Sequence, residues 1–149
     1  MSDGLDQLED EIMAEMRKVY TETAVDHAMN PRNVGSMPDA DSHASVLGPC
    51  GDSMEIWLKV RGDTVLDATF WTDGCGSSIA CGSMVTGLAK GKTLREALAI
   101  SAEVILRNLG GLPEDSLHCA GLASSTLKKA LIEYMNLQRE PWKKAYRRH

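Results

Sequence analysis

The chain has 149 residues, of which 43% are hydrophobic, and its formal net charge at pH 7 is −5. This length and composition are typical of one soluble domain, so we expect residues 1–149 to form a single unit with its core over about 20–135. The absence of a basic excess argues against nucleic acid or a membrane as the main partner. No apolar run resembles a signal peptide or reaches the ~18 residues of a membrane span, so we expect a cytoplasmic protein.

The first predicted element is an amphipathic helix over about residues 5–29. Its apolar residues recur at steps of three and four, as on one face of a helix: Leu5, Leu8, Ile12, Met16, Val19 and Tyr20. Acidic residues cluster near its start, where the helix dipole is positive. Pro31 ends the helix, because the residue before a proline is pushed out of the helical region. His27 lies on or near the apolar face, and we interpret it as a structural residue.

A loop over residues 31–41 is followed by two strands with alternating apolar residues. A two-residue turn at Gly62 and Asp63 would place Asp67 on the apolar face of this hairpin. We therefore expect a three-residue loop over 61–63, which pairs Met54 with Phe70, Ile56 with Ala68 and Leu58 with Leu66.

This register also predicts where the first two cysteines lie. Cys50 would be roughly opposite Gly74, the residue before Cys75. Cys50 and Asp52 would both lie on the side of the strand that faces the core. Two thiols and a carboxylate would thus converge at the open end of the hairpin.

The rest of the chain is predicted to be helical. Ser77 or Ser78 can cap a helix that runs to about Lys90, and the capping signals of two shorter helices are Thr93 with Glu96 and Ser101. A long helix follows, and His118 and Cys119 stand near its start. The fold class is therefore α+β, a small antiparallel sheet with helices packed mainly on one face.

Cysteine chemistry is the main functional signal. In a compartment that keeps thiols reduced, four cysteines are more plausible as ligands or reactive thiols than as disulfides. A soft metal or an iron–sulfur unit needs donors of the kind found in Cys50, Asp52, Cys75, His118 and Cys119. The starts of helices lower the pKa of a thiol, so Cys75 and Cys119 are expected to be accessible thiolates.

The fourth cysteine is expected to have a different role. Cys81 lies six residues after Cys75, which is about 240° around an ideal helix, so the two thiols would not share a face. We interpret Cys81 as a small core residue.

Four segments together resemble the IscU/NifU-type iron–sulfur cluster assembly scaffolds, and the resemblance extends over about residues 20–135. The segments are residues 26–35, 50–52, 74–80 and 117–119. The resemblance implies a scaffold rather than an enzyme. Such a scaffold takes sulfur from a cysteine desulfurase, takes iron, builds a transient [2Fe-2S] cluster and passes it to apo-proteins. A ferredoxin and a frataxin-like protein are further partners that the resemblance leaves open.

The resemblance also implies roles for individual residues. Cys50, Cys75 and Cys119 would bind the nascent cluster, and Cys119 would also accept persulfide sulfur. Asp52 and His118 would be further or alternate metal donors. An oxygen or nitrogen donor in place of a fourth thiolate makes a site more exchangeable, which suits a protein that releases what it builds.

The chain departs from the family pattern in three places, and one of them is Cys81, where these scaffolds commonly have serine. The lysine of the family's chaperone-recognition segment is absent, since residues 112–116 read Leu-Pro-Glu-Asp-Ser, which argues against a dedicated Hsp70-type partner. A basic and aromatic tail over residues 139–149 could dock on the acidic N-terminal helix, on a partner or on nucleic acid, or remain solvated.

Two other functions stay open. One is a zinc-binding sulfur acceptor of SufU type, which would use the same donors. Those proteins carry an insertion between the second and third cysteine segments, and none is visible here between Cys75 and Cys119. The other is an enzyme with a cysteine nucleophile, but His118 and Cys119 are neighbours on a helix and would point in different directions.

Overall fold

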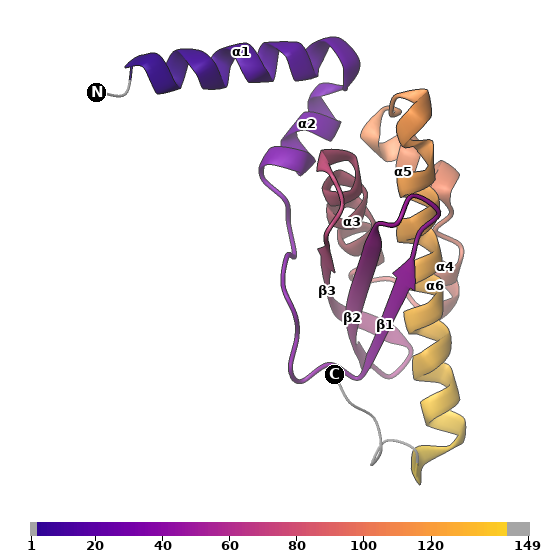
Figure 1. The fold of residues 1–149 in the computed structure, drawn as a ribbon. Coiled ribbons are helices and arrows are strands. Elements are labelled where there is room, and N and C mark those ends of the chain that lie inside the picture. Colours follow the sequence, from indigo (N-terminus) through magenta and orange to yellow (C-terminus); the bar gives the residue numbers. More distant parts are fainter. Residues whose placement is uncertain (1–2, 143–149) are drawn as a thin grey trace.

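The structure is a computed structural model that describes residues 3–142 (Figure 1). In chain order its elements are α1 (Asp3–Val19), α2 (Glu22–Met29), β1 (Ser42–Leu47), β2 (Ser53–Arg61), β3 (Thr64–Thr72), α3 (Gly76–Ala89), α4 (Leu94–Leu98), α5 (Ala102–Leu109), the 3₁₀ turn η1 (Glu114–Ser116) and α6 (Leu117–Arg139). No helix within residues 3–142 is long and apolar enough to cross a membrane.

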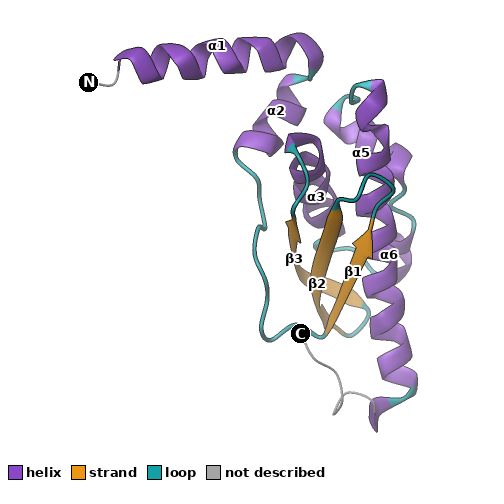
Figure 2. Cartoon of the chain, in the orientation of Figure 1, coloured by secondary structure: helices purple, strands orange, loops and turns teal. Residues whose placement is uncertain are grey.

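The strands form one antiparallel sheet in the order β1-β2-β3, and the helices cover one of its faces (Figure 2). α6 packs along β1 and β2, while α3 packs against β3. The predicted α+β class, with helices mainly on one face, is confirmed. The prediction lacked β1, whose sequence SHASVL shows only a weak apolar alternation. On the other face, Trp57 packs with Met37 and Ala40 of the loop that precedes β1.

The turn between β2 and β3 differs from the prediction. Gly62 and Asp63 do form a two-residue turn, and the pairing shifts by one residue between Lys59 and Val60. The shift leaves Leu66 unpaired in β3 with an exposed side chain, as expected for a β-bulge. The expected pairs are replaced by Met54 with Thr72, Ile56 with Phe70 and Leu58 with Ala68. Because of the bulge, Ala68 and Phe70 stay on the apolar face although the turn has only two residues. The argument against a two-residue turn, that it would place Asp67 on that face, therefore does not hold.

The predicted continuous helix over residues 5–29 is wrong, because the chain breaks between α1 and α2. Thr21 is the N-cap of α2, and its Oγ1 accepts a hydrogen bond from the Ala24 amide at 3.1 Å. The same hydroxyl donates to the carbonyl of Leu109 at the end of α5. A local cap and a distant acceptor therefore outweigh the helical periodicity. Beyond this break, α1 projects from the rest of the fold, with its apolar residues Leu5, Leu8, Ile12 and Val19 exposed (Figure 1).

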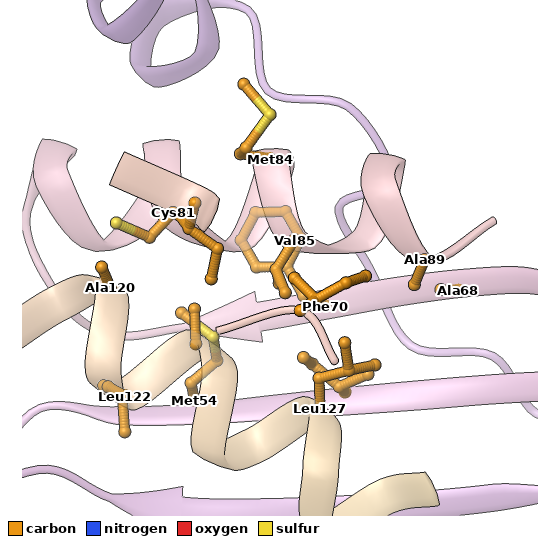
Figure 3. Close-up of a cluster of buried hydrophobic side chains, with 14 of the residues drawn as sticks. Met54, Ala68, Phe70, Cys81, Met84, Val85, Ala89, Ala120, Leu122 and Leu127 are labelled. Carbon is orange, nitrogen blue, oxygen red and sulfur yellow. The ribbon is translucent and has the colours of Figure 1, made fainter. Parts of the chain in front are cut away.

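Helix α3 lies close to the sheet because Gly82 has no side chain. A Cβ atom at Gly82 would overlap the ring of Phe70, which is itself 1% exposed. Figure 3 shows Phe70 between α3 and the rest of this core, with Val85 and Ala89 on the same side of the helix. The close approach fixes the position of α3 and therefore of the residues at its start.

A polar network joins α2 to α3. His27 Nδ1 lies 2.7 Å from Ser83 Oγ, and the amide of Arg32 donates to the same oxygen at 2.9 Å. Partial burial lowers the pKa of His27, the charge of Arg32 lowers it further, and Asp26 opposes both. These contacts agree with the interpretation of His27 as a structural residue.

The lowered pKa of His27 predicts a pH dependence of stability. The unfolded chain, in which this imidazole has its ordinary pKa of 6.5, binds the proton more readily than the folded chain does. The free energy of unfolding should therefore fall as the pH drops below about 6.5. Denaturant titrations at several pH values should show a shallower fall for His27→Gln. Equal slopes for the two proteins would contradict this assignment.

Candidate metal centre

Three separate segments bring the predicted donors to one end of the sheet. Cys50 and Asp52 lie in the connection between β1 and β2, Cys75 directly precedes α3, and His118 and Cys119 occupy the first turn of α6. The β1–β2 connection and α6 also share a groove, which is lined by Pro49 and His118 among others. The predicted convergence of the strand ends with the helix starts is therefore present in the fold.

Cys75 is exposed and stands at the N-cap position of α3. The remaining desolvation of this thiol raises its pKa, but hydrogen bonds from the amides and hydroxyls of Ser77 and Ser78 outweigh it, so the pKa is lowered. The expected accessible, thiolate-prone cysteine at a helix start is thus found at Cys75. The predicted cap by Ser77 or Ser78 is wrong, because both serines lie inside the first turn and are buried.

Cys119 differs from the prediction. Its side chain is 1% exposed, and burial raises the pKa of the thiol, with the hydroxyl of Ser78 acting in the opposite direction. Its sulfur lies 3.6 Å from Nε2 of His118, so the expectation that these two neighbouring side chains would point in different directions is wrong. The first turn of α6 packs against the core, which removes water from the sulfur, and no backbone amide within residues 3–142 lowers the pKa of this thiol as the position at a helix start had led us to expect. The expectation of an accessible thiolate at Cys119 is therefore wrong for this structure.

The hydroxyl of Ser78 links two of the donors. Ser78 Oγ lies 3.4 Å from Oδ2 of Asp52 and 3.4 Å from Sγ of Cys119, and the same side chain helps to lower the pKa of Cys75. Ser78 belongs to α3, so one residue of that helix joins the β1–β2 connection to the start of α6. Sequence reasoning missed this role, because a serine near the start of a helix looks like a capping residue.

Cys50 stands apart from this group. It is exposed in a tight turn closed by a bond from the Gly48 amide to the Asp52 carbonyl at 2.6 Å, and Gly51 has a φ of 87°. Among residues 3–142, no hydrogen bond joins the thiol of Cys50 to the other donors, and no group of three or more Cys, His, Asp or Glu is positioned to hold a metal ion. The donors are thus gathered at one end of the sheet, with Cys50 set to one side.

Cys81 is fully buried on α3, within the hydrophobic core (Figure 3). Burial raises the pKa of its thiol strongly, and the neighbouring Cys119 and Cys75 add to the shift. These properties agree with the expected small core residue.

The donor chemistry fits iron and sulfide. Thiolates are the usual ligands of iron–sulfur clusters, and a carboxylate and an imidazole nearby can complete a coordination sphere. The exposed thiols of Cys50 and Cys75 leave the site open to solvent and to another protein.

The chain is similar to proteins that are named as iron–sulfur cluster assembly scaffolds. The chain is 44% identical over 117 residues to the iron–sulfur cluster assembly scaffold protein IscU 1 of Archaeoglobus fulgidus, which covers 78% of this chain and 76% of the relative. It is 43% identical over 120 residues to the scaffold protein IscU of Haemophilus influenzae, covering 77% of this chain and 94% of the relative.

Solved structures share the fold. A NifU-like protein from Brucella abortus superposes with a TM-score of 0.60 at 20% identity, over 79% of this chain and 95% of its own. A protein described as a cluster assembly scaffold for the SUF system, from Fervidobacterium islandicum AW-1, has a TM-score of 0.62 at 24% identity, over 75% of this chain and 96% of its own.

A family model covers nearly all of the described chain. It matches residues 19–141, a span that begins at the end of α1 and includes all five predicted donors. By this match, the chain belongs to the family of NifU-like N-terminal domains.

Proposed function

We propose that this protein is a scaffold on which an iron–sulfur cluster is assembled and from which it is passed to apo-proteins. The observation that carries the proposal is the meeting of Asp52, Cys75 and Cys119 around one buried hydroxyl, in a chain similar to proteins named as assembly scaffolds. Three thiols from distant parts of the sequence at one end of a sheet are more than a structural core requires.

The donor set suits both assembly and release. We propose that Cys50, Cys75 and Cys119 hold a [2Fe-2S] cluster as cargo, and that Asp52 and His118 act as further or alternate donors. A carboxylate oxygen is a hard ligand that matches iron–sulfide chemistry less well than a thiolate does, so it exchanges more easily. A site with such a donor can give up its cluster to the thiols of a recipient.

Sulfur has to enter from a donor protein, which we propose to be a cysteine desulfurase. We propose Cys119 as the residue that holds the persulfide, and its burial adds a requirement, because the first turn of α6 has to become accessible to the donor. A ferredoxin and a frataxin-like protein would supply electrons and assist with iron. Reduced thiols at all four cysteines suit a cytoplasmic site of action.

The rival function is a zinc-binding sulfur acceptor with the same donors. The segment between Cys75 and Cys119 consists of α3, α4, α5 and η1 with short connections, which leaves no room for the insertion expected of that class. Absorption spectroscopy with metal analysis separates the two functions. A scaffold should form a chromophore that depends on iron and sulfide, whereas a zinc-binding sulfur acceptor should contain zinc and form none.

Substitution of each cysteine tests the ligand set. After anaerobic reconstitution with ferrous iron and sulfide, serine at Cys50, Cys75 or Cys119 should remove most of the visible absorption. The loss of a ligand should weaken binding by more than the ~10-fold typical of replacing a residue that only orients the ligands. Cys81→Ala should keep it, because that thiol lies in the core. Absorption spectroscopy with iron and sulfide analysis measures the outcome. A folded Cys81→Ala protein without a chromophore would show that the ligand set is wrong.

Mass spectrometry tests the entry of sulfur. Alkylation of the metal-free protein should modify Cys50 and Cys75 before Cys119, with Cys81 last. Cys50 and Cys75 are exposed and the pKa of Cys75 is lowered, whereas Cys119 and Cys81 are buried and their pKa values are raised. After incubation with a cysteine desulfurase and cysteine, the added sulfur should nevertheless be found mainly on Cys119. Sulfur found mainly on Cys75 would mean that exposure decides where the persulfide forms, and the assignment to Cys119 would be wrong.

A further inference from the structure

Ser78 is the one polar side chain of α3 that contacts donors of the proposed site from both of the other segments. It is 0% exposed, so its hydroxyl has no access to water and depends on protein partners. Those partners are the carboxylate of Asp52 and the sulfur of Cys119, each at 3.4 Å, together with Cys75. The distance to Asp52 is long for a hydroxyl bonded to oxygen, while the distance to the larger sulfur atom of Cys119 is ordinary, so the hydroxyl is shared and the carboxylate does not hold it to itself.

The chemistry of a hydroxyl makes this sharing necessary. Serine has one O–H proton, so Ser78 can donate to Asp52 or to Cys119 but not to both at the same moment. A metal ion bound by Asp52 and Cys119 would replace the hydroxyl as the link between them. Before the metal arrives, the hydroxyl keeps the two donors within reach of one another.

Gly74 makes room for this arrangement. A Cβ atom at Gly74 would overlap Ser78 and would lie 2.9 Å from Oδ2 of Asp52. The φ of Gly74 lies outside the left-handed region, so alanine would fit the backbone there and only the two side chains exclude it. The absence of a side chain at Gly74 therefore serves the approach of Asp52 to Ser78.

We propose that Ser78 is a positioning residue of the cluster site, which holds Asp52 and Cys119 in place for an incoming metal ion. The inference rests on the proposed function for the identity of the donors. Residues that orient metal ligands typically change metal affinity by about 10- to 100-fold when they are replaced. The effect of Ser78 should lie at the lower end of that range, because its contact with Asp52 is long and a bond to sulfur is weak.

Cobalt(II) alone is a suitable probe, because its binding needs neither sulfide nor a sulfur donor, and thiolate ligation gives it a charge-transfer spectrum. Ser78→Ala should bind cobalt about 10-fold more weakly than the parent while keeping the thiolate-to-cobalt bands. Gly74→Ala keeps the hydroxyl but displaces it, and should weaken binding in the same direction. If Ser78→Ala fails to fold, as judged by circular dichroism, Gly74→Ala still decides the question.

Ser83→Ala is the matched control. Ser83 is also a fully buried serine of α3, but it bonds to His27 and to the amide of Arg32, away from the cysteines. This variant should bind cobalt as tightly as the parent, even if its stability falls. A Ser78→Ala protein with the affinity of Ser83→Ala would overturn the proposal, as would weakening in Gly74→Ala alone or a parent that binds no cobalt through thiolates.

The same measurements separate this inference from the proposed function. A parent that binds cobalt through thiolates, with the predicted loss in Ser78→Ala, but that forms no chromophore from iron and sulfide would retain the role of Ser78 and refute the scaffold. A parent that forms the chromophore, with equal cobalt affinity in Ser78→Ala, would retain the scaffold and refute the role of Ser78.

Discussion

The contact between Phe70 and Gly82 determines how the rest of the structure is arranged around the site. Because glycine has no side chain, the phenyl ring fills the space next to the backbone of α3 and brings that helix against β3. β3 leads directly into the short connection before Cys75, so the position of α3 sets the position of Cys75 and Ser78. Core packing at Phe70 and Gly82 thus decides which donors can meet.

Burial divides the thiols into an outer and an inner set. Cys50 and Cys75 are exposed. Cys119 is buried where the first turn of α6 packs against the core, and Cys81 lies within the core. The outer thiols are available to a partner without any change in the fold, whereas Cys119 becomes available only when its surroundings open. The three proposed ligands therefore differ in how easily a partner protein can reach them, although their side chains are identical.

The general fold and the convergence of the donors could be predicted from the sequence, because strand ends and helix starts meet at the same end of a hairpin whatever its exact register. The bulge at Leu66 could not, since Leu66 is itself apolar and in the sequence continues the alternation of Ala68 and Phe70, although its side chain is exposed. The break at Thr21 depends on the carbonyl of Leu109, which is far away in the sequence. The burial of Cys119 and the contacts of Ser78 likewise arise from packing between elements, which periodicity does not describe.

The turn that carries Cys50 has a consequence for how a cluster can be enclosed. Residues 48–52 are closed by the short Gly48 to Asp52 bond and bend at Gly51, while the strands on either side remain paired along their length. If Cys50 is a ligand, as we propose, only this short turn has to move to bring its thiol to the metal ion, because the paired strands end at Leu47 and begin again at Ser53. In the proposed site, recruitment of Cys50 is therefore a local change at the rim of the sheet, separate from the opening of the first turn of α6 that the buried Cys119 would need.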